Sequence, residues 1–381
     1  MTGAMYAAIA GLKTHMTKMS VIGNNIANVN TNGFKSQRTI FKDAMYSMYS
    51  GGSDGTETAA GKNPSQIGYG SQVSSIDLNM ATGSFAPGIS TDCMIYGDGF
   101  FLMGDKDLAG VIDLENPASM KSLSLSRVGD FSFKADGYLS DGNGSVVYGF
   151  LTTGVDLDGK PKVSDQLVPI RLPKALNGEP AYPSDRPVEG EDEGEDDAAA
   201  RVPLHDFVMM EGGEGEEAVE RELPFVQLDS VAIDPVTGAI SGTTETGDPI
   251  IIGYLAIGKV TNPNGLTHTG GFYYSAGAGA GDLQVTMLGG VASELGITHV
   301  NGSLYNVGED ADDEDAPAQS EKMLIGDAGG TNLMTGGLEG SNVDLANEIA
   351  DMITTQRGYQ ANTRIITVTD AMLEELVNMK R

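Results

Sequence analysis

The first 26 or so residues carry a regular stripe of apolar side chains. Successive stripe positions are separated alternately by four and three residues, and six of the seven positions are apolar. The seven positions are Met5, Ile9, Leu12, Met16, Met19, Gly23 and Ile26. This spacing is that of a coiled-coil seam, so the sequence predicts an N-terminal helix with one apolar face.

The end of the chain carries a second stripe with the same alternation of steps. Seven of its ten positions are apolar. The ten positions are Leu345, Ile349, Met352, Gln356, Tyr359, Thr363, Ile366, Asp370, Leu373 and Val377. We expect Ser341 or Asn342 to cap this helix, with Asp344 in its first turn. The helix is expected to run to about Met379, because no proline interrupts the segment.

A helix with an apolar stripe must bury that stripe against another surface. One interpretation is that each terminal helix packs on its own domain. The other is that the two helices pair with each other and then pack against other subunits. The sequence alone leaves both interpretations open.

An Asn-rich segment marks the end of the first helix. Five of the thirteen residues from 23 to 35 are Asn, and Gly33 closes the run. Asn side chains bond to nearby backbone groups, and glycine accepts the left-handed conformation that often ends a helix. By itself this segment predicts a helix C-terminus followed by a turn.

From about residue 68 the pattern changes to short alternating runs separated by Gly, Asp and Asn. Examples are 73–78, 146–150 and 231–233, and residues 135–137 and 141–144 are strong hairpin signals. The sequence therefore predicts a multidomain chain of mixed α and β class. Its two ends are helical, and its middle is expected to form two mainly antiparallel β domains resembling sandwiches or barrels.

Acidic residues dominate the composition. The 381 residues include 53 Asp and Glu against 23 Lys and Arg, a net charge of −30. Two runs, 185–222 and 309–315, carry much of this charge and are expected to form solvated loops. Such a balance disfavours nucleic acid as a partner, because phosphate binding needs clustered basic residues. Neither run has the spacing of an EF-hand calcium loop, which disfavours calcium binding.

Enzyme, membrane and metal motifs are not found in the sequence. It holds no phosphate-binding loop, nucleophile elbow or paired-histidine zinc motif, so we expect no enzyme activity, no metal and no cofactor.

The one cysteine of the sequence, Cys93, is interpreted as a small core residue. No apolar run is long enough to span a membrane. Lys13 and His15 interrupt any signal-peptide core, so the chain is expected either to stay in the cytoplasm or to be exported without cleavage.

Several strings, taken in order along the chain, together resemble the axial proteins of the bacterial flagellum, the rod and hook family. They lie at 23–28, 30–35, 98–101, 135–139, 261–266, 338–345 and 356–362. The positions that carry the resemblance best are Asn24, Asn25, Asn28, Gly33, Phe34, Asp98, Gly99, Phe100, Asn342, Val343, Asp344, Gln356 and Arg357. Within the family the chain looks most similar to hook subunits, because rod members are usually shorter and lack an extra β domain such as 151–260.

The resemblance implies a structural subunit that polymerises into a curved hollow tube, which transmits torque from the motor and rod to the filament. The implied domains are an inner, discontinuous helical coiled-coil domain (1–28 and 338–381), a linker (29–66), a middle β domain (67–150 and 261–337) and an outer β domain (151–260) with the acidic loop 185–222. Implied partners are other copies of the chain, the flagellar rod, the hook cap, the hook–filament junction proteins and the type III export apparatus. The implied location is the flagellar hook, outside the cell, after export without a cleaved signal.

Two alternatives remain, and two features depart from the family pattern. A rod or other axial protein would share both ends of the chain, and a secreted adhesin would account for the β-rich middle but not for the helical ends. The acidic run 185–222 lies in the outer β domain, and a further insertion falls between about 281 and 322. Some relatives are cross-linked through a cysteine, but Cys93 stands where the family usually has an apolar strand residue.

Overall fold

The structure is a computed structural model, and its described residues form two compact units. It describes residues 2–55, 60–105, 120, 122–155, 161–163, 167–173, 210–211, 219–220, 226–245, 247–281, 283–288, 297–300, 303–306, 323–324 and 331–379. Unit 1 comprises Met1–Ala81 and Ser341–Arg381, and unit 2 comprises Thr82–Gly340. All of the acidic run 309–315, and most of 185–222, lie outside the described residues.

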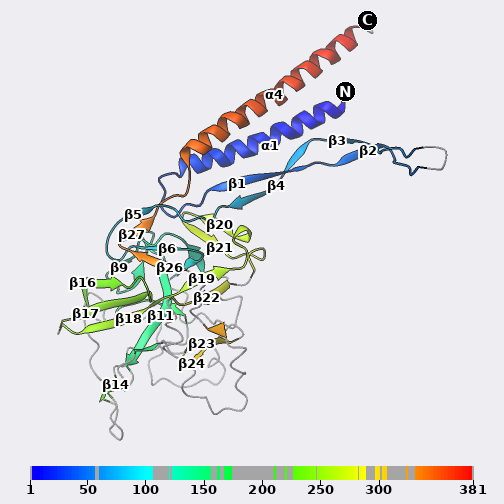
Figure 1. The fold of residues 1–381 in the computed structure, drawn as a ribbon. Helices are drawn as coiled ribbons and strands as arrows, with labels where there is room; N and C mark the ends of the chain where they lie inside the picture. The colour runs from blue at the N-terminus through cyan, green and yellow to red at the C-terminus, as the bar shows by residue number, and fades with distance from the viewer. Residues whose placement is uncertain are drawn as a thin grey trace, which may run out of the picture. The chain divides into compact units, whose positions relative to one another are not determined.

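Unit 1 contains two helices and four strands. They are α1 (Thr2–Ala27), α4 (Leu345–Asn378), β1 (Gln37–Asp43), β2 (Tyr46–Ser50), β3 (Ser65–Gly68) and β4 (Ser71–Leu78). The two helices pack side by side and run antiparallel, so both chain termini lie at the same end of the helix pair (Figure 1). β1 pairs with β4, and β2 pairs with β3, to form two-stranded antiparallel sheets. Strands β1 and β2 and the start of β3 fall within the segment expected as a linker, 29–66.

The second terminal helix begins later than the sequence suggested. Neither Ser341 nor Asn342 caps α4, so that prediction is wrong. Asp344 is the N-cap, and its carboxylate accepts hydrogen bonds from the backbone N–H groups of Ala346 (3.0 Å) and Asn347 (3.2 Å). The Asn342 side chain instead bonds backbone groups of distant segments, as described below, and so is not available to cap the helix.

Unit 2 is built almost entirely of antiparallel strands. Those from the first half of the unit are β5 (Phe85–Pro87), β6 (Cys93–Tyr96), β7 (Phe100–Gly104), β8 (Ser124–Ser126), β9 (Ser132–Phe133), β10 (Leu139–Ser140), β11 (Val146–Val155), β12 (Pro161–Val163) and β13 (Val168–Pro169). Those from the second half are β14 (Met210–Glu211), β15 (Val219–Glu220), β16 (Val226–Ile233), β17 (Ala239–Thr244), β18 (Pro249–Leu255), β19 (Ile257–Val260), β20 (Thr267–Gly270), β21 (Tyr273–Ser275), β22 (Leu283–Thr286), β23 (Ile297–Val300), β24 (Ser303–Asn306), β25 (Met323–Leu324), β26 (Asn332–Thr335) and β27 (Gly337–Glu339). A short 3₁₀ helix, η1 (Pro263–Gly265), precedes β20.

One large sheet organises this unit. Its main path runs β16-β17-β18-β11-β7-β8-β21-β20, and the long strand β11 also pairs with β10, β12 and β13. The predicted mixed class, with two helices and many antiparallel strands, is therefore confirmed. The division of unit 2 into a middle and an outer domain stays a prediction.

Both predicted hairpin turns are present. The turn between β9 and β10 places Gly137 at φ 83°, a conformation that favours glycine. In the turn between β10 and β11, Gly144 lies at φ 91°, and the Asp141 carboxylate accepts from the N–H groups of Asn143 and Ser145, both at 2.9 Å. Asp and Gly thus supply the turn chemistry that their positions in the sequence suggested.

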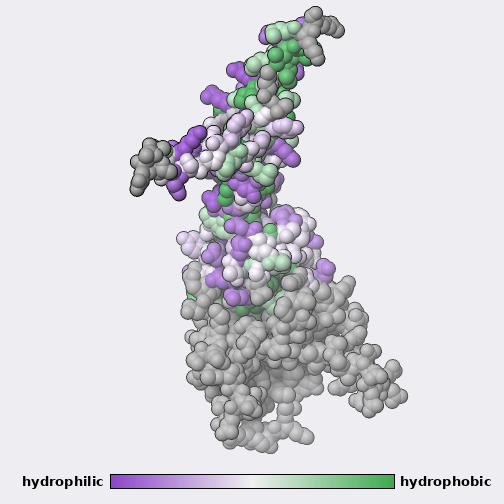
Figure 2. Space-filling view, turned by 90° about the vertical axis from the view of Figure 1, so that its right-hand side faces the viewer, coloured by the Kyte–Doolittle hydropathy of each residue, from purple (hydrophilic) through white to green (hydrophobic). Residues whose placement is uncertain are grey.

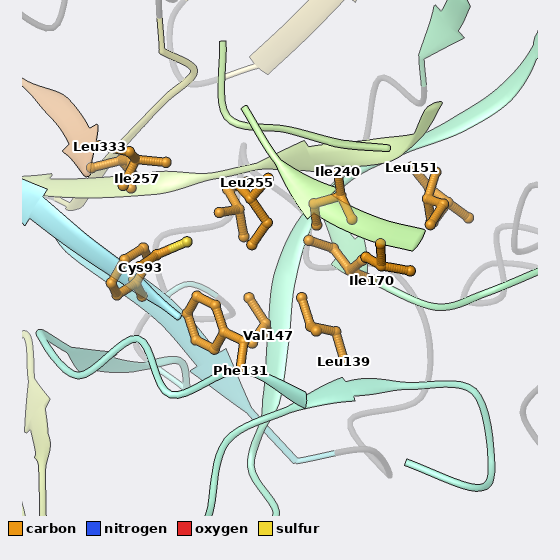
Figure 3. Packing of buried hydrophobic residues seen from close by; sticks show 14 of the residues in the cluster. Cys93, Phe131, Leu139, Val147, Leu151, Ile170, Ile240, Leu255, Ile257 and Leu333 are labelled. Carbon is orange, nitrogen blue, oxygen red and sulfur yellow. The ribbon is translucent and has the colours of Figure 1, made fainter. Parts of the chain in front are cut away.

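A large cluster of buried apolar side chains from many strands lies in the core of unit 2 (Figure 3). Cys93 is fully buried within it, as interpreted from the sequence, and burial raises the pKa of its thiol to about 12. Phe101 and Phe131 pack edge to face with ring centroids 4.9 Å apart. Burial of these side chains is the main source of stability for the β scaffold.

Candidate subunit interface

Small and polar residues line the contact between α1 and α4. A side chain at Gly11 would lie 2.7 Å from the Asn362 amide, and one at Gly358 would lie 2.8 Å from the His15 ring. Glycine at these two positions therefore lets the helices approach closely. The opposed pairs also fix the antiparallel register, since position 11 faces 362 and position 15 faces 358.

Polar bonds support the same contact. Lys18 Nζ lies 3.1 Å from Asp351 Oδ2, and the buried Asn25 donates from Nδ2 to Glu348 Oε1 at 3.0 Å. Burial raises the pKa of the Glu348 carboxyl above its usual value, and the hydrogen bond from Asn25 offsets part of this rise. Polar groups and the close approach at the two glycines thus help to hold the helix pair together.

The predicted stripe residues are partly buried or exposed in the single subunit. None of the thirteen apolar residues that we assigned to the seam is fully buried. The most exposed are Ile9 (45%), Met16 (55%), Leu345 (43%), Ile349 (46%), Leu373 (38%) and Val377 (67%). The others, which are partly buried, are Met5, Leu12, Met19, Ile26, Met352, Tyr359 and Ile366. The helices pair with each other, yet much of their apolar surface stays open to water.

Further apolar residues outside the predicted stripes are exposed on the same two helices. They are Tyr6, Ile353, Ile365, Val368, Met372, Leu376 and Met379. Figure 2 shows this hydrophobic surface, in green, along the helices and toward the end of α4. The heptad spacing describes only one face of each helix, so it did not mark these residues. A scan for apolar residues around the whole helix would have found them.

The last turns of α4 have no part of α1 opposite them. The register set by Gly11 and Asn362 places Thr2, the first residue of α1, opposite about residue 371. Residues 371–379, which we call the α4 overhang, are all exposed, and Figure 1 shows α4 continuing past the start of α1. This overhang presents apolar side chains that nothing in unit 1 covers.

The signature residues at the base of the helix pair tie distant segments of unit 1 together. Asn342 accepts at Oδ1 from the Ser36 N–H (2.7 Å) and donates from Nδ2 to the carbonyls of Asn79 (2.7 Å) and Ala81 (2.9 Å). The buried Lys35 donates from Nζ to the carbonyl of Ala81 at 3.0 Å. These bonds join the chain leaving α1 to the chain that enters α4.

Some of the remaining signature residues of unit 1 make local hydrogen bonds or turns. For the others, only the burial of the side chain is described. Asn28 donates from Nδ2 to the Asn24 carbonyl at 2.9 Å, and Gly33 lies at φ 69° in the turn that follows. The Phe34 carbonyl accepts from the Asn342 N–H at 3.4 Å. Val343 is half-buried, whereas Gln356 and Arg357 are exposed on α4.

In unit 2 the signature residues Asp98, Gly99 and Phe100 surround a buried ion pair. Gly99 lies at φ 140°, and a Cβ there would stand 2.5 Å from Ile257 Cγ2. Phe100 is buried, and the Asp98 carbonyl accepts from Thr331 Oγ1 at 2.8 Å. Backbone carbonyl groups of the preceding strand β6 and of this turn accept hydrogen bonds from the Arg127 side chain.

Arg127 and Glu339 form the ion pair, and sequence reasoning missed it. Their side chains are 0% and 1% exposed, and Arg127 Nε donates to Glu339 Oε2 at 3.0 Å. Arg127 Nη1 also donates to the carbonyls of Gly97 (2.9 Å) and Gly99 (2.6 Å). Glu339 accepts from the Gly83 N–H at 2.9 Å. No local pattern joins partners 212 positions apart in the sequence, so only the fold reveals them.

The comparisons with known proteins agree with this arrangement. The family model for flagella basal body rod proteins matches residues 5–35, and the model for the C-terminal part of the flagellar basal body rod FlgEFG proteins matches residues 334–379. The hook protein FlgE of Borreliella burgdorferi is 29% identical over the full length of both chains. The rod protein FlgG of Bacillus subtilis (27%) and the hook protein FlgE of Treponema pallidum (26%) also match over 100% of both chains. The chain is therefore similar along its full length to bacterial flagellar rod and hook proteins, and both of its ends match family models of that group.

The flagellar rod and hook proteins that this chain resembles are structural components of the flagellum and are not an enzyme family. Among the described residues, no group of three or more His, Cys, Asp or Glu side chains could hold a metal ion. No helix in the described part of the chain is long and apolar enough to cross a membrane.

Proposed function

We propose that this chain is the structural subunit of the bacterial flagellar hook. It would polymerise into a curved hollow tube that acts as a universal joint between the rod and the filament. The observation that carries the proposal is the exposed apolar surface of α1 and α4, including Ile9, Met16, Ile349 and Val377. Apolar surface of this extent on paired helices is costly in water and is stabilised when other copies cover it.

The arrangement of the helix pair suits open-ended growth. The polar bonds and close approach of the two helices can hold one subunit together, while their exposed apolar side chains remain for neighbours. A tube that keeps growing needs heterologous contacts, in which one patch meets a different patch on the next copy. The thirteen predicted seam residues would then lie between subunits and form the inner core of the tube.

Bending requires each line of subunits to lengthen and shorten as the hook turns. The helical core would stay packed, while the β domains slide past those of neighbouring copies with little difference in energy between registers. The Asn-rich segment after α1, and the connection that follows, would supply the hinge. The partners in this scheme are the rod, the hook cap, the hook–filament junction proteins and the type III export apparatus, which would deliver the chain outside the cell without cleavage.

A rod subunit is the second candidate. The full-length similarity to a rod protein of Bacillus subtilis favours it, because that match extends over 100% of both chains. The region 151–260 favours the hook, since the family resemblance associates an additional β domain with hook subunits. Strands β16, β17 and β18 belong to this region and join the main sheet of unit 2.

Immunogold electron microscopy of purified hook–basal bodies distinguishes the two candidates. An epitope tag inserted in the acidic run 186–222 marks the chain, and particles from the untagged strain measure background. Gold along the curved segment between the envelope and the filament is the result expected for a hook subunit. Gold confined to the straight shaft within the envelope would make the chain a rod subunit. Tagged particles that contain the protein but bind no gold would mean that this run is buried and the outer-domain assignment is wrong.

A further inference from the structure

A two-stranded ribbon in unit 1 carries a second apolar surface, separate from that of the helices. Its base, β1 with β4, lies against α1, where Thr14 Oγ1 and Ser71 Oγ are 3.2 Å apart and Gly70 approaches Ala7. Beyond Gly70 the ribbon continues as β2 and β3, which form a sheet with each other alone among the described strands. Figures 1 and 2 both show this part running away from the helix pair.

One face of the β2–β3 hairpin is strongly apolar. Side chains alternate between the two faces of a strand, and the pairing sets Ser47 opposite Ile67 and Met45 beside Tyr69. Met45, Ile67 and Tyr69 therefore share a face and are 79%, 53% and 41% exposed, and Tyr49, at the irregularity between Met48 and Ser50, is 80% exposed. We call these four residues the hairpin patch. The opposite face carries Tyr46 and Met48 together with Gly68 and Gln66.

An isolated two-stranded hairpin is marginally stable in water at best, so this one needs a covering surface. The exposed parts of the four side chains in the hairpin patch amount to about 400–500 Å² if a fully exposed large side chain presents ~150–200 Å². That area is roughly half of the ~800 Å² that one partner contributes to a stable protein interface. The hairpin patch can therefore supply a large part of an interface that other contacts of the polymer complete.

The α4 overhang of a second copy fits this requirement. It offers apolar side chains of its own, Met372, Leu376 and Met379 being 48%, 44% and 81% exposed. The described hairpin residues carry one acid, Asp54, and one base, Lys62, so the hairpin does not repel the acidic residues of that helix end. Pairing of two hairpins would be an isologous contact that closes on itself, whereas hairpin against overhang is heterologous and permits continued growth.

We propose that the hairpin patch of one subunit packs against the α4 overhang, residues 371–379, of a neighbouring copy of the same chain. The proposal deepens the proposed function, because it names a contact of the polymer that the function requires. It also accounts for two projecting apolar segments in unit 1 with a single interface.

Photo-crosslinking in a mixed polymer tests the contact. The variant Tyr49→p-benzoylphenylalanine is prepared in ¹⁴N and ¹⁵N forms, mixed in equal amounts, assembled and illuminated, and tryptic peptides are identified by mass spectrometry. We expect a crosslink between peptide 43–62 of one isotopic form and peptide 365–380 of the other, with attachment in 371–379. The probe at Gln66, on the opposite face of the hairpin, is the matched control. It lies in peptide 63–106, and it should give several-fold less crosslinking of that peptide to peptide 365–380.

Each outcome decides the proposal. Crosslinks to another region of a second copy, or only within one copy, would overturn the assignment of hairpin to overhang. If the probe at Tyr49 prevents assembly, the same probe at Met45 reports on the same patch. Failure of the unsubstituted protein to assemble at all would count against the proposed function, whereas a normal polymer without these crosslinks would count against the interface alone.

Discussion

Replacing Ile349 by Asp separates the stability of one subunit from the assembly of many. Ile349 lies in the second turn of α4 and is 46% exposed. In the monomer the carboxylate of the Ile349→Asp variant would reach water. We therefore expect the free energy of unfolding of the monomer to fall by only ~1 kcal/mol, from partial loss of apolar burial.

The expected cost in the polymer is much larger. Full burial of an Ile side chain contributes ~1.5–3 kcal/mol, so covering its exposed half contributes ~1 kcal/mol, which is about fivefold in association. The Asp variant loses this contribution and also takes a charge out of water, which costs several kcal/mol more. Together these effects should weaken each subunit contact by more than ~100-fold.

The assay compares secreted and assembled protein. Cells that express Ile349→Asp, Leu345→Asp or Leu373→Asp should release unpolymerised chain into the medium and carry no hooks. Thr354→Asp is the matched control, because it puts the same charge on an exposed polar position of the same helix. The control should assemble almost as the unsubstituted chain does. Normal hooks from all three stripe variants would refute the placement of this stripe between subunits.

Three further predictions concern unit 2. Glu339→Ala leaves the buried Arg127 guanidinium without its carboxylate, so calorimetry should show a loss of ~3–5 kcal/mol in the free energy of unfolding; a loss below ~1 kcal/mol would contradict this. Gly99→Ala combines an unfavourable φ of 140° with a clash and should cost ~3 kcal/mol, whereas Gly144→Ala, with open space around it, should cost about 1 kcal/mol; equal losses would argue against the clash. The Cys93 thiol, whose pKa burial raises to about 12, should resist iodoacetamide at pH 8 until the protein is unfolded, and rapid labelling of the native chain would disprove its place in the core.

Local pattern predicted those parts of the fold that depend on local interactions. The heptad spacing located both helices, and α1 runs from Thr2 to Ala27, close to the length of its stripe. The Asp–Gly and Asn–Gly turns located two hairpins of the β scaffold, where Gly137 and Gly144 take positive φ. In each case residues within one or two turns of each other determine the geometry.

Long-range contacts explain what the sequence could not predict. Asn342 is a good helix cap by type, but its side chain bonds Ser36, Asn79 and Ala81, so Asp344 takes the capping position. The apolar stripes predicted the helices but left their partner open, and the α1–α4 contact includes glycines and polar groups that the stripes do not mark. The hairpin patch gave no signal in the sequence, because alternating Tyr, Met and Ile residues are equally typical of a buried strand.

Cysteine accessibility measured before and after assembly tests most directly whether neighbouring copies cover the outer helix surface. Cys93 is buried, so Ile349→Cys introduces the one readily reactive thiol, and a maleimide reports its exposure. We predict rapid labelling of the monomer and at least tenfold slower labelling in the assembled polymer, with Thr354→Cys as a second position for comparison. Equal labelling of Ile349→Cys in the monomer and in a polymer of normal length would contradict the account.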